Sequence, residues 1–253
     1  MDTPLLSIIT INYNNAQGLA KTINSVISQP INDYSQIEYI IVDGASTDES
    51  ISIIKNAELK KGNLNFIWNS EPDSGIYNAM NKGIKKSNGK YIHMLNSGDY
   101  LEPNVLEVII EKLHHNPDLL LCGINLIEPV GIVKTEVRHP CNLNYGSMSH
   151  QGMIYLKAFH EKLGFYDEKY KFASDYDFSL KAFYNKQLYL EVIYNPCVNF
   201  ECGGVGVSNK SMEELQNIKI KAGLIKPPTK NYLKRIIKFF VPYGLILLYQ
   251  KIK

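Results

Sequence analysis

The sequence predicts an α/β fold with a mostly parallel central sheet. Short runs rich in Ile, Val and Leu alternate four times with amphipathic helical patterns before residue 116. Such alternation is typical of a parallel sheet with helices on both faces and right-handed crossovers. A chain of 253 residues with 45% hydrophobic residues has enough apolar material for one large domain of this kind.

The N-terminal half is predicted from periodicity and breaking residues. Continuous apolar runs, typical of buried strands, span residues 5–11, 38–42, 64–69 and 90–95. A helical pattern follows each strand, at residues 19–29, 49–56, 76–86 and 103–114. Pro30 ends the first helix, and either Thr47 or Asp48 can cap the second.

The second half is less regular. Residues 119–127 and 131–137 predict a pair of antiparallel strands, and later patterns predict strands at 153–156 and 188–194 with helices at 157–163, 176–185 and 211–222. The Pro227-Pro228 pair is the best domain boundary. We therefore expect a catalytic domain over residues 1–226 and a C-terminal extension over residues 227–253.

The C-terminal extension is basic and amphipathic. From Leu215 onward there are nine Lys or Arg residues and no acidic residue, which leaves 18 basic and 25 acidic residues in the preceding part. One helical face carries the apolar residues and the other most of the charges; the apolar residues are Leu233, Ile236, Ile237 and Phe240. Such a helix can lie on an anionic membrane surface or pack on the protein itself.

Location is predicted from what the sequence lacks. No segment reaches the ~20 apolar residues that span a bilayer, and the N-terminus does not resemble a signal peptide. The four cysteines have no metal-site spacing, so we expect reduced thiols. These features predict a cytoplasmic protein, peripheral on the inner face of the plasma membrane.

Polar and acidic clusters follow three of the expected strands, at residues 12–15, 43–48 and 96–99. A turn containing Asp73 follows the remaining strand, at residues 64–69. In an open parallel sheet these segments meet at one edge, where ligands bind. Converging carboxylates repel one another unless a cation lies among them. The pattern therefore favours a divalent metal, Mg²⁺ or Mn²⁺, that holds a diphosphate.

Two nucleotide-binding classes are disfavoured, because neither GxGxxG nor GxxxxGK[ST] follows the first strand. This argues against a nicotinamide dehydrogenase and a P-loop kinase. Each acidic residue taken alone could be an ordinary turn or cap residue. Their joint occurrence, in order, favours a functional site.

Four motifs in order make the chain resemble the family 2 glycosyltransferases of the GT-A fold. The motifs are SIITINYN (residues 7–14), VDGASTD (42–48), EPDSGIYNAMNKG (71–83) and LNSGD (95–99). His150-Gln151, residues 173–177 and Gly203-Gly204 also resemble later elements of the family, so the resemblance covers roughly residues 5 to 210.

The resemblance implies an inverting, metal-dependent transfer of a sugar from a UDP-sugar. It implies that Asp175 is the general base and that Asp99 holds Mn²⁺ or Mg²⁺. Asp43 would accept hydrogen bonds from uracil, and Asp73 would contact uracil or ribose. The other implied nucleotide-sugar contacts are Thr10, Asn12, Tyr13, Asn14, Ser46, Ser74, Gly75, Asn81, Asn96, Ser97 and His150.

Two positions depart from the family pattern. Asn96 stands where the family's Asp-x-Asp motif has its first carboxylate, and Ser174 replaces a Glu before Asp175. An Asn can still bind a metal through its carbonyl oxygen or a water.

Direct displacement of a diphosphate needs one carboxylate opposite the leaving group and a cation beside it. Asp175, at the start of an expected helix, should be ionised at neutral pH.

The acceptor implied by the resemblance is a glycan or a lipid-linked sugar, and no nucleic acid is expected as a partner. The expected pathway is bacterial surface polysaccharide biosynthesis, such as O-antigen, capsule or exopolysaccharide. Acceptor-binding loops are expected at residues 140–152 and 202–209. One alternative is a sugar nucleotidyltransferase, which would have a Gly-rich basic loop at residues 12–15. The other is an inactive nucleotide-binding scaffold, against which Asp99 and Asp175 argue.

Overall fold

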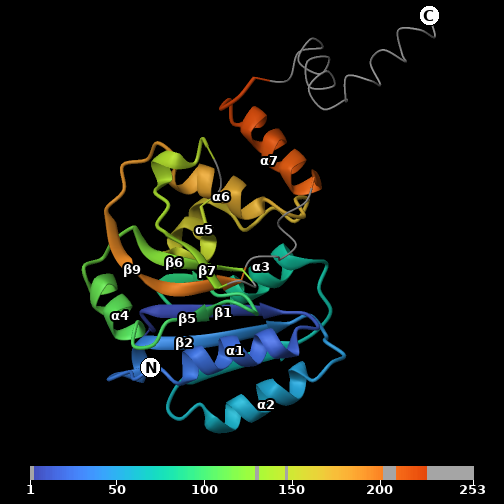
Figure 1. Ribbon diagram of the computed structural model, residues 1–253, viewed down its shortest axis with the longest axis vertical. Coiled ribbons are helices and arrows are strands. Elements are labelled where there is room, and N and C mark those ends of the chain that lie inside the picture. The colour runs from blue at the N-terminus through green and yellow to red at the C-terminus, as the bar shows by residue number, and fades with distance from the viewer. Residues whose placement is uncertain (1–2, 129–130, 146–147, 202–208, 227–253) are drawn as a thin grey trace, which may run out of the picture. The chain divides into compact units, whose positions relative to one another are not determined.

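The computed structural model describes residues 3–128, 131–145, 148–201 and 209–226 (Figure 1). In this part of the chain nine strands form one sheet in the order β3-β2-β1-β4-β8-β6-β9-β5, with β7 paired to β6. The strands are β1 (Leu6–Asn12), β2 (Ile37–Asp43), β3 (Asn65–Ser70), β4 (Tyr91–Met94), β5 (Tyr100–Leu101), β6 (Leu119–Glu128), β7 (Gly131–Glu136), β8 (Met153–Leu156) and β9 (Leu190–Glu201). The α-helices are α1 (Ala16–Ile27), α2 (Ser50–Lys60), α3 (Ile76–Lys86), α4 (Leu106–His114), α5 (Ala158–Leu163), α6 (Ser174–Phe183) and α7 (Asn209–Lys221).

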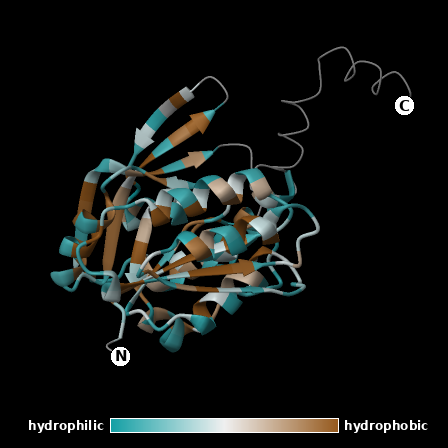
Figure 2. Ribbon diagram, turned by 90° about the horizontal axis from the view of Figure 1, so that it is seen from below, coloured by the Kyte–Doolittle hydropathy of each residue, from teal (hydrophilic) through white to brown (hydrophobic). Residues whose placement is uncertain are grey.

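The N-terminal half is the predicted parallel sheet. Strand β1 pairs in parallel with β2 and β4, and β2 pairs in parallel with β3. Alternate residues of β1 face opposite layers: Ile8 joins the core cluster that contains Leu19 of α1, whereas Ile9 contacts α3 at Gly83. Every residue of β1 and β2 is buried because helices cover both faces, and Figure 2 shows strands coloured largely hydrophobic beside helices of mixed hydropathy.

The C-terminal half makes the sheet mixed. Four strand pairings are parallel and four are antiparallel, and all the antiparallel ones involve β5, β7 or β8. The predicted β6–β7 hairpin is present, since a short connection can join only antiparallel neighbours. The α/β fold class is confirmed, and the parallel arrangement is confined to β1–β4 and the β6–β9 pair.

Pairing between strands distant in sequence sets the bounds of the elements that sequence periodicity did not predict correctly. Strand β9 runs to Glu201, past the predicted end at residue 194, because it pairs along most of β6 and then with β5. The two-residue strand β5 has no sequence pattern of its own and was not predicted. A 3-10 turn at His150–Gly152 precedes β8 and carries a predicted site residue.

The chain divides into two compact units, Met1–Glu214 and Leu215–Lys253. The boundary expected at Pro227 and the basic amphipathic extension both lie outside the described residues. Across the described ranges no helix is long and apolar enough to cross a membrane. The three described cysteines, Cys122, Cys141 and Cys197, are free thiols.

A buried carboxylate holds the sheet together at the start of β2, the end opposite the polar strand ends. Glu38 is 0% exposed and accepts hydrogen bonds from the Ser7 hydroxyl and from the backbone N–H groups of Asn88 and Gly89. Gly89 has no room for a side chain, since a Cβ would lie 2.4 Å from the Ser7 hydroxyl oxygen. Glu38 thus joins β1 and β2 to the turn before β4.

We expect Glu38→Ala to lower the free energy of unfolding by about 3 kcal/mol, because it leaves buried N–H and hydroxyl donors without an acceptor. Urea denaturation followed by circular dichroism measures this. The matched control is Glu111→Ala on the exposed face of α4, which should change stability by less than about 0.5 kcal/mol. Equal effects of the two substitutions would contradict the role given to Glu38.

Candidate active site

The loops after β1, β2 and β4 are tied together at one rim of the sheet. The Asn14 backbone N–H donates to the Ser46 hydroxyl (2.8 Å), and the Thr47 N–H donates to the Asn14 side-chain oxygen (2.8 Å). The Asn15 amide donates to the Ser97 carbonyl (3.2 Å). The polar clusters that follow separate strands in the sequence are therefore neighbours in space, as their position at parallel strand ends predicted.

Asp43, at the end of β2, organises this rim. Its carboxylate is 0% exposed and accepts hydrogen bonds from Asn12, Ser70 and both the hydroxyl and N–H of Ser46, at 2.6–2.9 Å. Burial opposes the charge, but these donors outweigh it and lower the Asp43 pKa. The carboxylate thus holds the turn in place, and its contact with uracil remains a prediction.

Two predicted ligand-binding residues, Tyr13 and Asp73, converge beside Asp43. A Cβ on Gly44 would lie 2.5 Å from a carboxylate oxygen of Asp73 and 3.2 Å from the ring of Tyr13. Only glycine allows this approach, so Gly44 brings Asp73 and Tyr13 to one place. Tyr13 is 67% exposed. An exposed aromatic ring beside a carboxylate and a bare backbone is an arrangement that can stack on a base and accept its N–H groups.

The predicted base, Asp175, lies in the first turn of α6 with its side chain 18% exposed. The Tyr77 hydroxyl donates to Asp175 Oδ1 (2.7 Å), and His150 Nδ1 lies 3.3 Å from Oδ2. Burial raises the Asp175 pKa, but the contacts with His150 and Tyr77 outweigh it and lower the pKa. Asp175 is therefore ionised at neutral pH and able to accept a proton.

His150 connects the base to the end of β4. Its Nε2 lies 3.1 Å from the side-chain amide nitrogen of Asn96. Burial opposes protonation of His150, yet the hydrogen bond to Asp175 and the charges of Asp175 and Asp99 raise its pKa. The 3-10 turn before β8 thus places His150 between Asn96 and the predicted base, Asp175.

Asp99 and Asn96 fit a hard divalent cation. Asp99 is 5% exposed, and burial raises its pKa to about 7 despite the opposing effect of His150. The Asn96 side-chain oxygen is buried and has no hydrogen-bond partner among the described residues. A desolvated carboxylate and an orphaned oxygen suit Mn²⁺ or Mg²⁺. In the described ranges no three His, Cys, Asp or Glu side chains are arranged so that they could hold a metal ion by themselves, so a bound ion would need diphosphate and water as further ligands.

Two predicted contact residues lie away from the rim. Thr10 is 0% exposed inside β1, where its hydroxyl donates to the Leu95 carbonyl (2.7 Å). Asn81 is 3% exposed and exchanges two hydrogen bonds, of 2.9 and 3.0 Å, with the backbone of Tyr166. Both side chains are used in packing here, and their direct contact with a nucleotide sugar stays a prediction. Inferring contacts from motif membership misses this distinction.

A carboxylate with no motif to reveal it supports the Asp73 turn. Glu168 accepts hydrogen bonds from the side chains of Ser74 (3.2 Å), Asn78 (3.0 Å) and Asn81 (3.1 Å). Gly75 is the N-cap of α3 and has φ +135°, a conformation that L side chains rarely adopt, and its N–H donates to Asp73 (2.9 Å). Ser74 and Gly75 therefore shape the turn that presents Asp73.

A second unpredicted carboxylate supports the base. Glu214 accepts hydrogen bonds from the backbone N–H groups of Lys171 (2.7 Å), Phe172 (2.7 Å) and Ala173 (3.1 Å). Ala173 is the N-cap of α6 and has no side-chain hydrogen bond of its own. Glu214 thus caps the helix that carries Asp175 from a distant part of the chain, a contact that local sequence cannot reveal.

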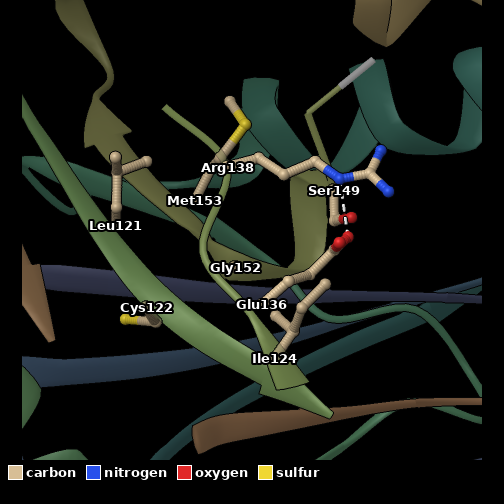
Figure 3. A pocket seen from close by; sticks show the side chains of 8 residues that line it. All are labelled: Leu121, Cys122, Ile124, Glu136, Arg138, Ser149, Gly152 and Met153. Atoms are coloured by element: carbon tan, nitrogen blue, oxygen red, sulfur yellow. Dashed lines mark ion pairs between the residues drawn. The ribbon is translucent and has the colours of Figure 1, made fainter. Parts of the chain in front are cut away.

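A small cavity lies behind the 150–152 turn, between β6, β7 and β8 (Figure 3). Its volume of about 10 Å³ has room for a single water molecule. The Glu136–Arg138 ion pair (2.6 Å) lies along one side, with Ser149, Gly152 and Met153 nearby. A nucleotide sugar is too large for this cavity. The open rim is the candidate site because the predicted ligand-binding side chains Tyr13 and Asp73 meet there.

Solved structures share this architecture. S. aureus TarS (residues 1–349), solved in complex with UDP, superimposes with a TM-score of 0.70 and 21% identity, covering 96% of this chain and 75% of TarS. The mannosyltransferase PcManGT from Pyrobaculum calidifontis, solved with GDP-Man and Mn²⁺, has a TM-score of 0.64 and 16% identity, covering 88% of this chain and 65% of PcManGT. Both likenesses show the GT-A-type fold.

Sequence comparison adds the family. An uncharacterised glycosyltransferase of Mycobacterium tuberculosis is 31% identical over 212 residues, 80% of this chain and 77% of the relative. A PGL/p-HBAD biosynthesis glycosyltransferase of Mycobacterium bovis is 26% identical over 230 residues, 88% of each chain. The model of glycosyl transferase family 2 matches residues 7–170. The rim residues from Asn12 to Asp99 lie within that match, and the chain belongs to glycosyl transferase family 2.

Proposed function

We propose that the protein moves one sugar from a UDP-sugar to a hydroxyl group of a glycan or lipid-linked acceptor, with inversion at the anomeric carbon. The observation that carries the proposal is the placement of Asp175: its side chain is 18% exposed, and Tyr77 and His150 contact its two carboxylate oxygens. Bacterial surface polysaccharide biosynthesis is the proposed pathway.

In the proposed reaction Asp175 accepts the proton of the acceptor hydroxyl while that oxygen attacks the anomeric carbon. The bond between this carbon and the diphosphate oxygen breaks, and its electron pair leaves with UDP. A single displacement with one base inverts the configuration. Mn²⁺ or Mg²⁺, held by Asp99 with Asn96, would neutralise the charge that develops on the diphosphate. His150, which interacts with both Asp99 and Asp175, would contact the diphosphate or the acceptor.

We expect Asp175→Asn to reduce sugar transfer at least ~100-fold while UDP binding stays within about twofold, because the amide cannot accept the proton. The rate of transfer is measured as UDP release in a screen of UDP-sugars against a panel of glycan and lipid-linked acceptors. Asp33→Asn, on an exposed side chain before β2, is the control and should keep full activity. Undiminished transfer by Asp175→Asn would refute the assignment, and a wild type without turnover would favour the scaffold alternative.

The nucleotide and the metal are tested together. UDP with Mn²⁺ should raise the melting temperature more than GDP at the same concentration, since only the favoured ligand stabilises by mass action, about 2.7 kcal/mol at 100 times Kd. Asp99→Asn and excess EDTA should both remove the metal-dependent part of this shift. The comparison matters because PcManGT was solved with GDP-Man and TarS with UDP. Equal shifts with UDP and GDP, or full activity in EDTA, would contradict this part of the proposal.

The basic extension supports a proposed location at the inner face of the plasma membrane, where a lipid-linked acceptor would be confined to the same surface. Each Lys or Arg near an anionic leaflet contributes roughly 1 kcal/mol. Full-length protein should therefore bind vesicles rich in anionic lipid, and salt should weaken the binding. Truncation after Lys226 should abolish it and leave the domain folded. Unfolding of the truncated protein, or no vesicle binding at low salt, would assign the extension a structural role.

A further inference from the structure

The hydroxyl of Tyr77 is hydrogen-bonded to the proposed base, Asp175. Tyr77 is the second residue of α3, is 5% exposed, and its hydroxyl donates to Asp175 Oδ1 over 2.7 Å although 98 residues separate the two. A carboxylate can only accept, so the direction of this hydrogen bond is settled. Burial and the charge of Asp175 raise the Tyr77 pKa well above its usual value. The hydroxyl therefore stays protonated, and remains a donor, wherever the enzyme is folded.

The carboxylate of Asp175 needs such an anchor. The terminal torsion of an aspartate is broad, so the side chain alone does not choose an orientation. Tyr77 engages Oδ1 and His150 lies 3.3 Å from Oδ2, and the two come from different elements, α3 and the 150–152 turn. Two anchors on opposite oxygens define the plane of the carboxylate and leave lone pairs of Oδ2 available to a hydroxyl of the acceptor.

Tyr77 is itself held rigidly. Its ring packs against that of Tyr166, with centroids 5.6 Å apart. The backbone of Tyr166 is bonded on both its N–H and C=O groups to Asn81, one turn along α3 from Tyr77. Glu168 accepts a further hydrogen bond from Asn81 (3.1 Å). One helix face thus carries both the hydroxyl that engages the base and the amide that fixes its packing partner.

We propose that Tyr77 is a positioning residue, which holds the carboxylate of Asp175 in the orientation that takes the proton from the acceptor hydroxyl. The inference rests on the proposed function, since it presupposes Asp175 as the base. The ring of Tyr77 packs in the protein, whereas its hydroxyl donates to the Asp175 carboxylate and also faces the backbone N–H groups of Ser174 and Asp175 at the start of α6. Removing only the oxygen therefore separates packing from positioning.

Tyr77→Phe tests the proposal. It should lower kcat for transfer 10- to 100-fold, because a misplaced base loses near-attack geometry, while KM for the donor and UDP affinity change less than twofold. The hydrogen bond from Tyr77 favours the ionised carboxylate, so its loss should move the acidic limb of the kcat–pH profile to higher pH. The other titratable groups facing Asp175 are unchanged in this variant: His150, Tyr155 and Tyr166.

The matched control is Tyr91→Phe. Tyr91 lies at the start of β4, away from the rim, and is also buried. Its hydroxyl donates to the Pro117 carbonyl (2.9 Å). It should lose stability comparable to Tyr77→Phe but keep kcat and the position of the acidic limb. A fluorinated tyrosine at position 77 keeps ring and hydroxyl, donates more strongly, and should move the limb to lower pH. This second variant serves even if Tyr77→Phe folds poorly.

The outcomes separate the two proposals. If wild type transfers sugar and Asp175→Asn does not, but Tyr77→Phe keeps the wild-type kcat and pH profile, the positioning role of Tyr77 is overturned and the proposed function stands. A lower melting temperature with an unmoved acidic limb would also overturn it, since a purely structural tyrosine has that effect. If Asp175→Asn transfers at the wild-type rate, the base assignment and the proposed function fail together.

Discussion

The charge on Asp175 is the constraint on which the arrangement of the site depends. A carboxylate with 18% of its side chain exposed has lost most of its hydration, and it stays ionised only where donors replace the water. Tyr77 and His150 supply those contacts. Helix α3, the 150–152 turn and the start of α6 must therefore meet at one point, and the loops around them are shaped accordingly.

The donor side of the rim follows a different rule. There the carboxylate of Asp43 is fully buried and already satisfied by four donors within the protein, which makes it a structural centre for the turns after β1 and β2. The groups left to face a ligand are Tyr13 and Asp73, brought together over Gly44. Polar groups whose hydrogen bonds are made within the protein build the rim. Groups without a partner in the described residues, such as the Asn96 side-chain oxygen, can bind a ligand or a metal ion.

Carboxylates distant in sequence make the site rigid. Glu168 joins the Asp73 turn to the loop before α6, and Glu214 caps α6 itself through three backbone N–H groups. Neither residue touches the expected position of the reacting atoms. Their bonds connect the Asp73 turn, α3 and the start of α6, so that the relative placement of Asp73 and the proposed base is a property of the packed domain.

The sequence by itself determined the α/β class, the four strand ends that build the rim and the motifs of Asp43, Asp73, Asp99 and Asp175, because apolar periodicity and turn chemistry are local signals. It did not reveal β5, the length of β9, the buried positions of Thr10 and Asn81, or the contacts of Tyr77, Glu168 and Glu214. Those features depend on pairing and hydrogen bonds between residues tens of positions apart, and only the tertiary structure decides which distant donor meets which acceptor.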